Sequence, residues 1–142
     1  MVELGTFGAI LKYALDIENE VSVFYKTAAG LPVNQNLVAM CLELSNRGEK
    51  RVKTLERIRR ENVTEMILES IVGLNSDDYI ITTKIPPSAN DKVLKQIAIN
   101  IETTLQDFYN TAATKIEFLS EAAYAFEILA EKNAETKKRI SS

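Results

Sequence analysis

The stretch ALDIENEVSVFYKTAA at residues 14–29 recurs as AINIETTLQDFYNTAA at residues 98–113. The two copies align without a gap at a constant offset of 84 residues, so that Glu18 corresponds to Glu102. Within each copy the alanines, the glutamate and the tyrosine follow one another at spacings of three, four or seven residues, which is the spacing of one helix face. Two helices of the chain are therefore expected to be duplicates. An approximate twofold axis would relate them, with Glu18 and Glu102 facing each other across it.

Helical periodicity covers most of the remaining chain as well. It predicts long helices over residues of about 4–29, 34–61, 89–116 and 120–140, and a short helix over residues 63–72. Short links favour antiparallel neighbours, whereas the long stretch that ends at Pro86 and Pro87 is expected to be an extended crossover. The sequence thus predicts a single domain over residues 1–142, an all-α, antiparallel four-helix bundle with a long crossover between helices 2 and 3.

The composition narrows the possible chemistry. The proportions of hydrophobic residues (46%) and charged residues (26%) are those of a globular domain, and a net charge of −3 argues against nucleic-acid binding. No apolar run reaches the length of a membrane span, and the N-terminus lacks the pattern of a signal peptide, so we expect a cytoplasmic protein. The chain has no histidine, which excludes Ser-His-Asp triads, Cys-His pairs and every metal motif that requires an imidazole.

The repeated pattern, A-x-x-x-E-x-x-x-x-x-F-Y-x-x-A-A, resembles the rubrerythrin branch of the ferritin-like superfamily. The resemblance extends over most of the chain through the helix pairing and the central crossover. It implies a bundle in which the first helix of each pair supplies one inward Glu and the second supplies Glu-x-x-His, so that six groups hold two iron ions. Glu18 and Glu102 match the two single glutamates.

The paired motifs of that family do not survive in this chain. In the second helix, Glu-x-x-His falls best on Gly48 and Arg51. In the last helix, periodicity places two residues at the corresponding depth, Asn133 and Thr136, and a shifted register would instead offer Glu131 and Ala134. Neither register restores the motif. The sequence therefore predicts a degenerate di-iron centre.

Two inward carboxylates without partners would be costly, because a buried charge must be paired or neutralised. We interpret Arg51 as a replacement charge whose guanidinium forks onto Glu18, in space left by Gly48. Donors for Glu102 are expected from Asn133, Thr136 or Lys137, and the hydroxyls of Tyr25 and Tyr109 are expected to reach the glutamates. The predicted polar network that replaces the metal comprises Glu18, Tyr25, Arg51, Glu102, Tyr109, Asn133 and Thr136.

In the opposite interpretation, the two inward glutamates still bind a metal ion. Carboxylate-only sites suit hard cations such as Mn²⁺ and Mg²⁺, so Glu18 and Glu102, aided by Glu131 or, after a register slip, by Glu49, could hold one. Iron or manganese is then the possible cofactor. The first functional hypothesis is accordingly a non-catalytic protein, with no catalytic residue or cofactor, that acts through a ligand or partner. The alternative is a di-metal carboxylate oxidoreductase that reduces peroxide or oxidises iron.

A homodimer is expected because bundles similar to this one commonly pair, and the segment from Tyr79 to Ile85 is one candidate surface.

Overall fold

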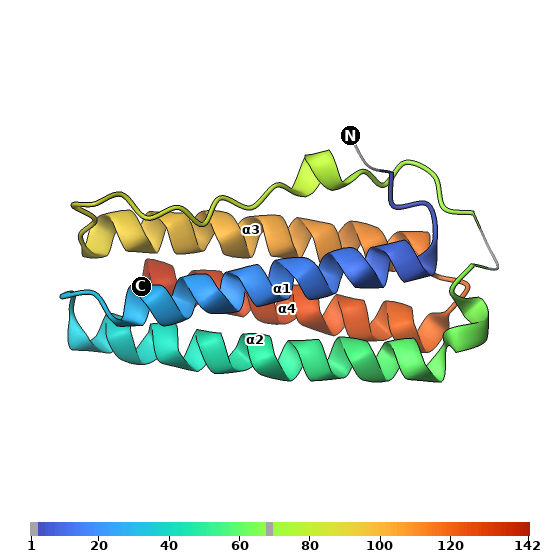
Figure 1. Cartoon of the computed structure of the whole chain (residues 1–142), viewed down its shortest axis with the longest axis horizontal. Helices are drawn as coiled ribbons and strands as arrows, with labels where there is room; N and C mark the ends of the chain where they lie inside the picture. The colour runs from blue at the N-terminus through green and yellow to red at the C-terminus, as the bar shows by residue number, and fades with distance from the viewer. Residues whose placement is uncertain (1–2, 68–69) are drawn as a thin grey trace.

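The computed structural model describes residues 3–67 and 70–142, and it is helical throughout its main elements. The four α-helices are α1 (Phe7–Ala29), α2 (Gln35–Glu61), α3 (Asp91–Lys115) and α4 (Ser120–Ser141) (Figure 1). Two short 3-10 turns, η1 (Val63–Glu65) and η2 (Ser76–Tyr79), lie between α2 and α3. Within the described residues there is no strand, only an isolated antiparallel bridge between Glu3 and Asn75. The prediction of an all-α, four-helix structure is confirmed.

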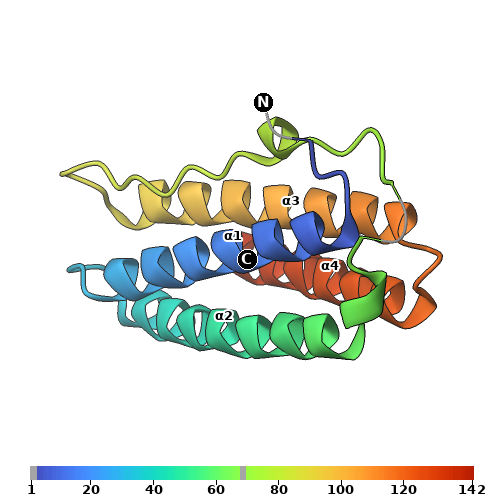
Figure 2. The same ribbon diagram turned by 45° about the vertical axis from the view of Figure 1, so that its right-hand side comes forward.

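The four helices lie side by side along one long axis (Figures 1 and 2). Helix α1 packs mainly against α2, and α3 packs mainly against α4, so the chain forms two helical hairpins. The connection between α2 and α3 returns along the length of the bundle beside α3 (Figure 1). Each helix buries one apolar face, as the spacing of the apolar residues requires, and together these faces form the core.

The first helix begins later than predicted. Its N-cap is Thr6, whose side-chain oxygen accepts a hydrogen bond from the Ala9 amide at 3.1 Å. Residues 3–5 do not join the helix because they pair with the connection instead. The Leu4 amide donates to Leu74 (2.7 Å), and the Ile71 amide donates to Gly5 (2.9 Å). The predicted start at residue 4 is therefore wrong by three positions.

The short helix predicted over residues 63–72 is also wrong, since only the 3-10 turn at Val63–Glu65 forms within the described residues. Residues 68 and 69 lie outside those residues. The backbone after this turn contacts the first turn of α1, where the Gly8 amide donates a hydrogen bond to the Met66 carbonyl at 3.1 Å. Gly73, with a φ of 82°, then makes a turn that most other residues would resist. The other predicted boundaries, 34–61, 89–116 and 120–140, agree with the observed ones to within two residues.

Six polar or charged residues break the apolar core, and they occur on all four helices. They are Glu18, Ser45, Arg51, Glu102, Asn133 and Thr136. Among the described residues, no helix combines the length and the apolarity that crossing a bilayer requires. The six polar side chains lose their contact with water inside the bundle, and hydrogen bonds or ion pairs must replace that hydration.

Candidate functional site: a buried ion-pair network

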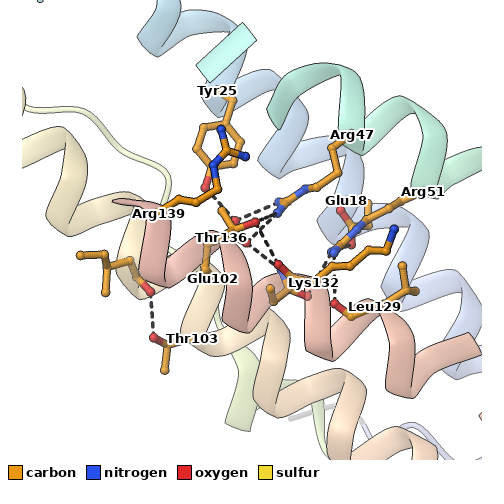
Figure 3. Close-up of polar contacts among 12 residues, drawn as sticks. Glu18, Tyr25, Arg47, Arg51, Glu102, Thr103, Leu129, Lys132, Thr136 and Arg139 are labelled. Atoms are coloured by element: carbon orange, nitrogen blue, oxygen red, sulfur yellow. Dashed lines mark hydrogen bonds and ion pairs between the residues drawn. The ribbon is translucent and has the colours of Figure 1, made fainter. Parts of the chain in front are cut away.

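Polar side chains from all four helices meet in the interior of the bundle (Figure 3). Glu18 comes from α1 and Glu102 from α3, and neither side chain is exposed to solvent. Helix α2 contributes Arg47 and Arg51, which are one helical turn apart and point into the same region. The periodicity that predicted inward-facing glutamates at both repeat positions is confirmed by their burial.

Glu102 is held by a bidentate arginine. Nη1 of Arg47 donates to Oε1 at 2.6 Å, and Nη2 donates to Oε2 at 2.8 Å. The Tyr25 hydroxyl adds a hydrogen bond to Oε2 at 2.7 Å, and the Asn133 amide adds one to Oε1 at 2.8 Å. Each oxygen of Glu102 therefore accepts two hydrogen bonds, which uses the four lone-pair positions of a carboxylate.

Glu18 is held less completely. Its Oε2 accepts from Arg51 Nη1 at 3.1 Å and from the Tyr109 hydroxyl. The predicted fork of Arg51 onto Glu18 does not form, since the guanidinium divides its donors between helices. Nη1 is shared with Asn133 Oδ1 (3.1 Å), and Nη2 donates to the Leu129 carbonyl (3.1 Å). Glu18 Oε1 is buried and has no hydrogen-bond partner in the described chain.

Asn133 links the two ion pairs. Its amide nitrogen donates to Glu102 and its oxygen accepts from Arg51, so one α4 side chain joins both carboxylate centres. Thr136, a second predicted α4 donor, contacts Arg47 at 3.4 Å and donates its own hydroxyl to the Lys132 carbonyl. Lys137 does not reach Glu102, because its ammonium group bonds Gln106. Of the donors proposed for Glu102 from α4, Asn133 alone contacts it among the described residues.

The tyrosines follow the approximate symmetry of the repeat. Tyr25 of α1 bonds the glutamate of α3, and Tyr109 of α3 bonds the glutamate of α1. An arginine also lies over each ring, with Arg47 5.8 Å from the Tyr25 centroid and Arg51 5.7 Å from the Tyr109 centroid. The repeat therefore produces two similar clusters, each formed by a Glu, a Tyr and an Arg.

The electrostatics favour an ionised pair between Glu102 and Arg47. Burial by itself would raise the pKa of Glu102, but the Arg47 charge and the hydrogen bonds from Arg47, Tyr25 and Asn133 outweigh it and lower that pKa. Burial opposes the charge of Arg47 as well, yet the Glu102 carboxylate keeps the arginine pKa raised. Burial and the neighbouring carboxylates raise the pKa values of both Tyr25 and Tyr109 well above the usual value. The tyrosines are therefore neutral donors at physiological pH.

The symmetry fails in the placement of positive charge. Both arginines come from α2, whereas the α4 positions, Asn133 and Thr136, are neutral. Inside the bundle the α1–α2 hairpin contributes Glu18, Arg47 and Arg51, a net charge of +1, and the α3–α4 hairpin contributes Glu102, a net charge of −1. The network is neutral only when the two hairpins are together.

The residues present do not fit the di-metal centre that the family resemblance implies. Glu102 has no free lone-pair position, and the two arginines already neutralise the two buried glutamates. Glu49 and Glu131, the carboxylates that other registers would supply, are exposed on the bundle surface. Within residues 3–67 and 70–142, no group of three or more His, Cys, Asp or Glu side chains could hold a metal ion.

Gly48 has a different role from the one predicted. A Cβ atom at this position would lie 2.7 Å from the Ser22 Cβ and 3.4 Å from the Glu18 carbonyl oxygen. The glycine therefore permits the close approach of α2 to α1, and the space it leaves is filled by the neighbouring helix. The Ser22 hydroxyl uses this proximity to donate to the Ser45 carbonyl at 2.9 Å.

Arg47 was not among the predicted site residues; it lies beside the buried stripe of α2 and has a side chain 15% exposed. Helical periodicity places such a position at the edge of the inward face, where a long side chain can enter the core or turn towards solvent. One feature of the sequence could have identified Arg47 as a site residue. Arg47 precedes Arg51 by one turn, so both arginines can serve the same interior region.

Comparisons with known protein families, with curated proteins and with solved structures found no match to this chain.

Proposed function

We propose that this chain is a ferritin-like bundle of the rubrerythrin type whose centre is closed by ion pairs instead of metal. In this proposal it acts without catalysis, by association with a partner. Support for the relationship comes from the repeated framework and from Glu18 and Glu102, which are both buried at matching positions. Further support comes from the two hairpins and the long connection that runs beside α3.

The observation that carries the proposal is the saturation of Glu102. A carboxylate that accepts two hydrogen bonds on each oxygen, two of the four from the half-buried guanidinium of Arg47, offers a metal ion no lone pair. A cation placed there would also meet Arg47 and Arg51, whose positive charges repel it. The network therefore supplies charge balance and hydrogen bonding in the region where the family would place iron.

The chain's one thiol does not suggest a nucleophile. Cys41 is buried, and burial raises its pKa to about 11, so the thiol is protonated at neutral pH. It lies among apolar neighbours that include Leu37 and Leu44, where it packs as a small hydrophobic side chain.

Elemental analysis tests the proposal directly. Protein purified without chelators should contain iron, manganese and zinc far below one ion per chain, both before and after incubation with each metal. The double variant Glu18→Gln/Glu102→Gln is the matched control, because it removes both carboxylate charges. A stoichiometric metal content in the wild type that this variant loses would overturn the proposal.

The alternative, a di-metal oxidoreductase, has one observation in its favour. Glu18 Oε1 is buried and unpartnered, so it is the one carboxylate oxygen of the network that could accept a further ligand. Aerobic addition of Fe²⁺, followed by visible absorption and by peroxide consumption, distinguishes the two functions. Colour development and turnover that disappear in Glu18→Gln would establish the alternative, whereas their absence in the wild type agrees with a closed centre.

A further inference from the structure

Residues 80–85, in the connection before α3, form an extended segment whose backbone is unpaired. Their sequence is IITTKI, in which five of six residues are β-branched. In the described part of the chain, no backbone amide or carbonyl of these residues forms a hydrogen bond. Side-chain exposure alternates as in a β-strand, with Ile80, Thr82 and Lys84 exposed and the intervening residues half-buried. The segment therefore offers a free strand edge, which is a template for a further strand.

The bundle already holds this segment in place. At its beginning, the Tyr13 hydroxyl donates to the Tyr79 carbonyl at 2.8 Å. The half-buried isoleucines of the segment pack against the core. The Thr83 hydroxyl donates to the Glu20 carboxylate at 3.4 Å, which ties the segment to α1. An edge that is ordered in advance loses little conformational entropy when another strand pairs with it.

An open groove of about 620 Å³ lies between this segment and α1. Its apolar lining comes from Val23, Phe24 and Ile85, and Val23 is 64% exposed. Glu20 is the charged residue among the side chains that line it. The groove thus combines an apolar surface, one negative charge and a free strand edge.

The acidic and apolar parts of the lining are spaced like side chains on one face of a β-strand. Glu20 meets Thr83 at one point, and further along lie Phe24, one helical turn on, and Ile85, two residues on. The segment and α1 run in the same direction along the bundle (Figure 1). Four helix residues advance about 6 Å and two strand residues about 6.6 Å, so the two walls stay in register. A strand in the groove would therefore place residue i at Glu20 and residue i+2 at Phe24, or the reverse.

We propose that this groove binds an extended peptide segment of a partner protein, which adds a strand to residues 80–85 and carries a lysine or arginine two residues from an apolar side chain. The basic side chain pairs with Glu20, and the apolar one packs on Val23 and Phe24. An extended chain can bond the free backbone groups of the segment, whereas a helix has its own backbone groups paired. An acidic segment would meet like charge at Glu20.

This inference deepens the proposed function and rests on it, since it names the surface and the partner chemistry through which a non-catalytic bundle would act. The two can fail separately. A metal-free protein that does not bind the peptide overturns the docking site alone. A protein that binds the peptide and also carries stoichiometric metal overturns the metal-free function alone.

The probe is a fluorescein-labelled synthetic peptide, Thr-Lys-Thr-Val-Thr-Lys-Thr, whose valine has a lysine two residues away in both directions, so that it serves a parallel or an antiparallel strand. Fluorescence anisotropy with the full chain should show saturable binding with a Kd below about 1 mM. Glu20→Lys should weaken this binding by about tenfold or more, because like charges then meet in the groove. The same variant should bind a peptide with both lysines replaced by glutamate more tightly than the wild type does, since the exchange restores opposite charges.

Glu56→Lys, the same charge reversal at an exposed position of α2, is the matched control and should leave peptide binding unchanged. Circular dichroism verifies that each variant remains folded. A peptide with N-methylated threonines keeps the side chains but loses backbone donors, so it should not bind. In ¹⁵N–¹H spectra, the unmodified peptide should shift the amide signals of residues 80–85.

Three results would overturn the inference. The first is the absence of saturable binding of the peptide to the wild type below about 1 mM. The second is binding that survives either Glu20→Lys or N-methylation of the peptide. The third is self-association of the wild type, seen by sedimentation velocity, that excludes the peptide, because it would assign the groove to a second copy of the chain.

Discussion

Replacing Arg47 by methionine isolates the energetic role of the bidentate ion pair. The substitution keeps much of the apolar stem but removes both donors to Glu102, whose carboxylate stays fully buried with Tyr25 and Asn133 as its remaining partners. Leaving one member of a buried ion pair without its partner costs about 3–5 kcal/mol. At pH 7 we therefore expect the free energy of unfolding to fall by that amount, with a fall in Tm of roughly 10–20 °C.

The pH dependence of this loss gives a sharper test than its size. In the wild type the pKa of Glu102 is lowered, so its contribution to stability is present above the unfolded pKa and disappears as pH falls through the folded one. Without Arg47, burial dominates and raises the pKa of Glu102 above its unfolded value. Protonation of that carboxyl then becomes favourable on folding, so the variant should recover part of its deficit as pH falls from 7 to 5.

Urea unfolding followed by circular dichroism at pH 7 and pH 5 measures both effects. Arg57→Met, a change at an arginine 58% exposed on the same helix, is the control and should shift stability by no more than about 0.5 kcal/mol. Adding Glu102→Gln to Arg47→Met should recover stability at pH 7, because the uncompensated charge is gone. The reasoning fails if Arg47→Met costs less than about 1 kcal/mol, or if its deficit stays constant between the two pH values.

Three further predictions concern individual side chains. Gly48→Ala should destabilise the bundle by about 1–3 kcal/mol in urea unfolding, because its new Cβ would lie 2.7 Å from the Ser22 Cβ; an unchanged unfolding midpoint would show that α2 and α1 can separate at no cost. Tyr109→Phe should cost about 1.5–3 kcal/mol by the same measurement, since Arg51 would then be the single hydrogen-bond donor to Glu18; equal stability of wild type and variant would contradict the hydrogen bond. Burial raises the pKa of Cys41 to about 11, so at pH 8 the native thiol should react with a disulfide reagent on the order of 100-fold more slowly than in the unfolded chain, and comparable rates would show that it is accessible.

The segregation of charge between hairpins gives the network a further physical consequence. Pairing two α1–α2 hairpins would bury a net charge of +2, and pairing two α3–α4 hairpins would bury a net charge of −2. Both combinations carry a large desolvation cost without compensation. The buried charges therefore specify that each hairpin packs on the other kind, even though the repeat makes their apolar faces similar.

Much of the site could be predicted from the repeat. The constant offset identified Glu18 and Glu102 as equivalent, and helical spacing predicted that both, together with Tyr25 and Tyr109, face inward. Periodicity also placed Asn133 in the interior. These inferences succeed because a helix face is determined by local spacing, whichever partner the helix finds.

The pairing of the charges could not be predicted in the same way. Arg51 divides its donors between Glu18 and α4, and Arg47, at the edge of the helix face, saturates Glu102. An arginine side chain extends far enough that its partner depends on the separation and rotation of the neighbouring helices, which adjacent residues along the chain do not specify. The N-terminal boundary was missed for a similar reason, because residues 3–5 pair with residues 71–75, far away in the sequence.

The sequence by itself determined the all-α class, the duplicated helices, the inward glutamates and the absence of any histidine ligand, since all of these follow from composition and local periodicity. The tertiary structure decided which cation neutralises which carboxylate, that Gly48 allows α2 to approach α1, and that residues 80–85 form an unpaired strand edge. The physical reason is the range of the interactions. Helix faces are set by neighbours within a turn or two, whereas ion pairs, close helix contacts and free edges depend on segments that meet only when the chain has folded.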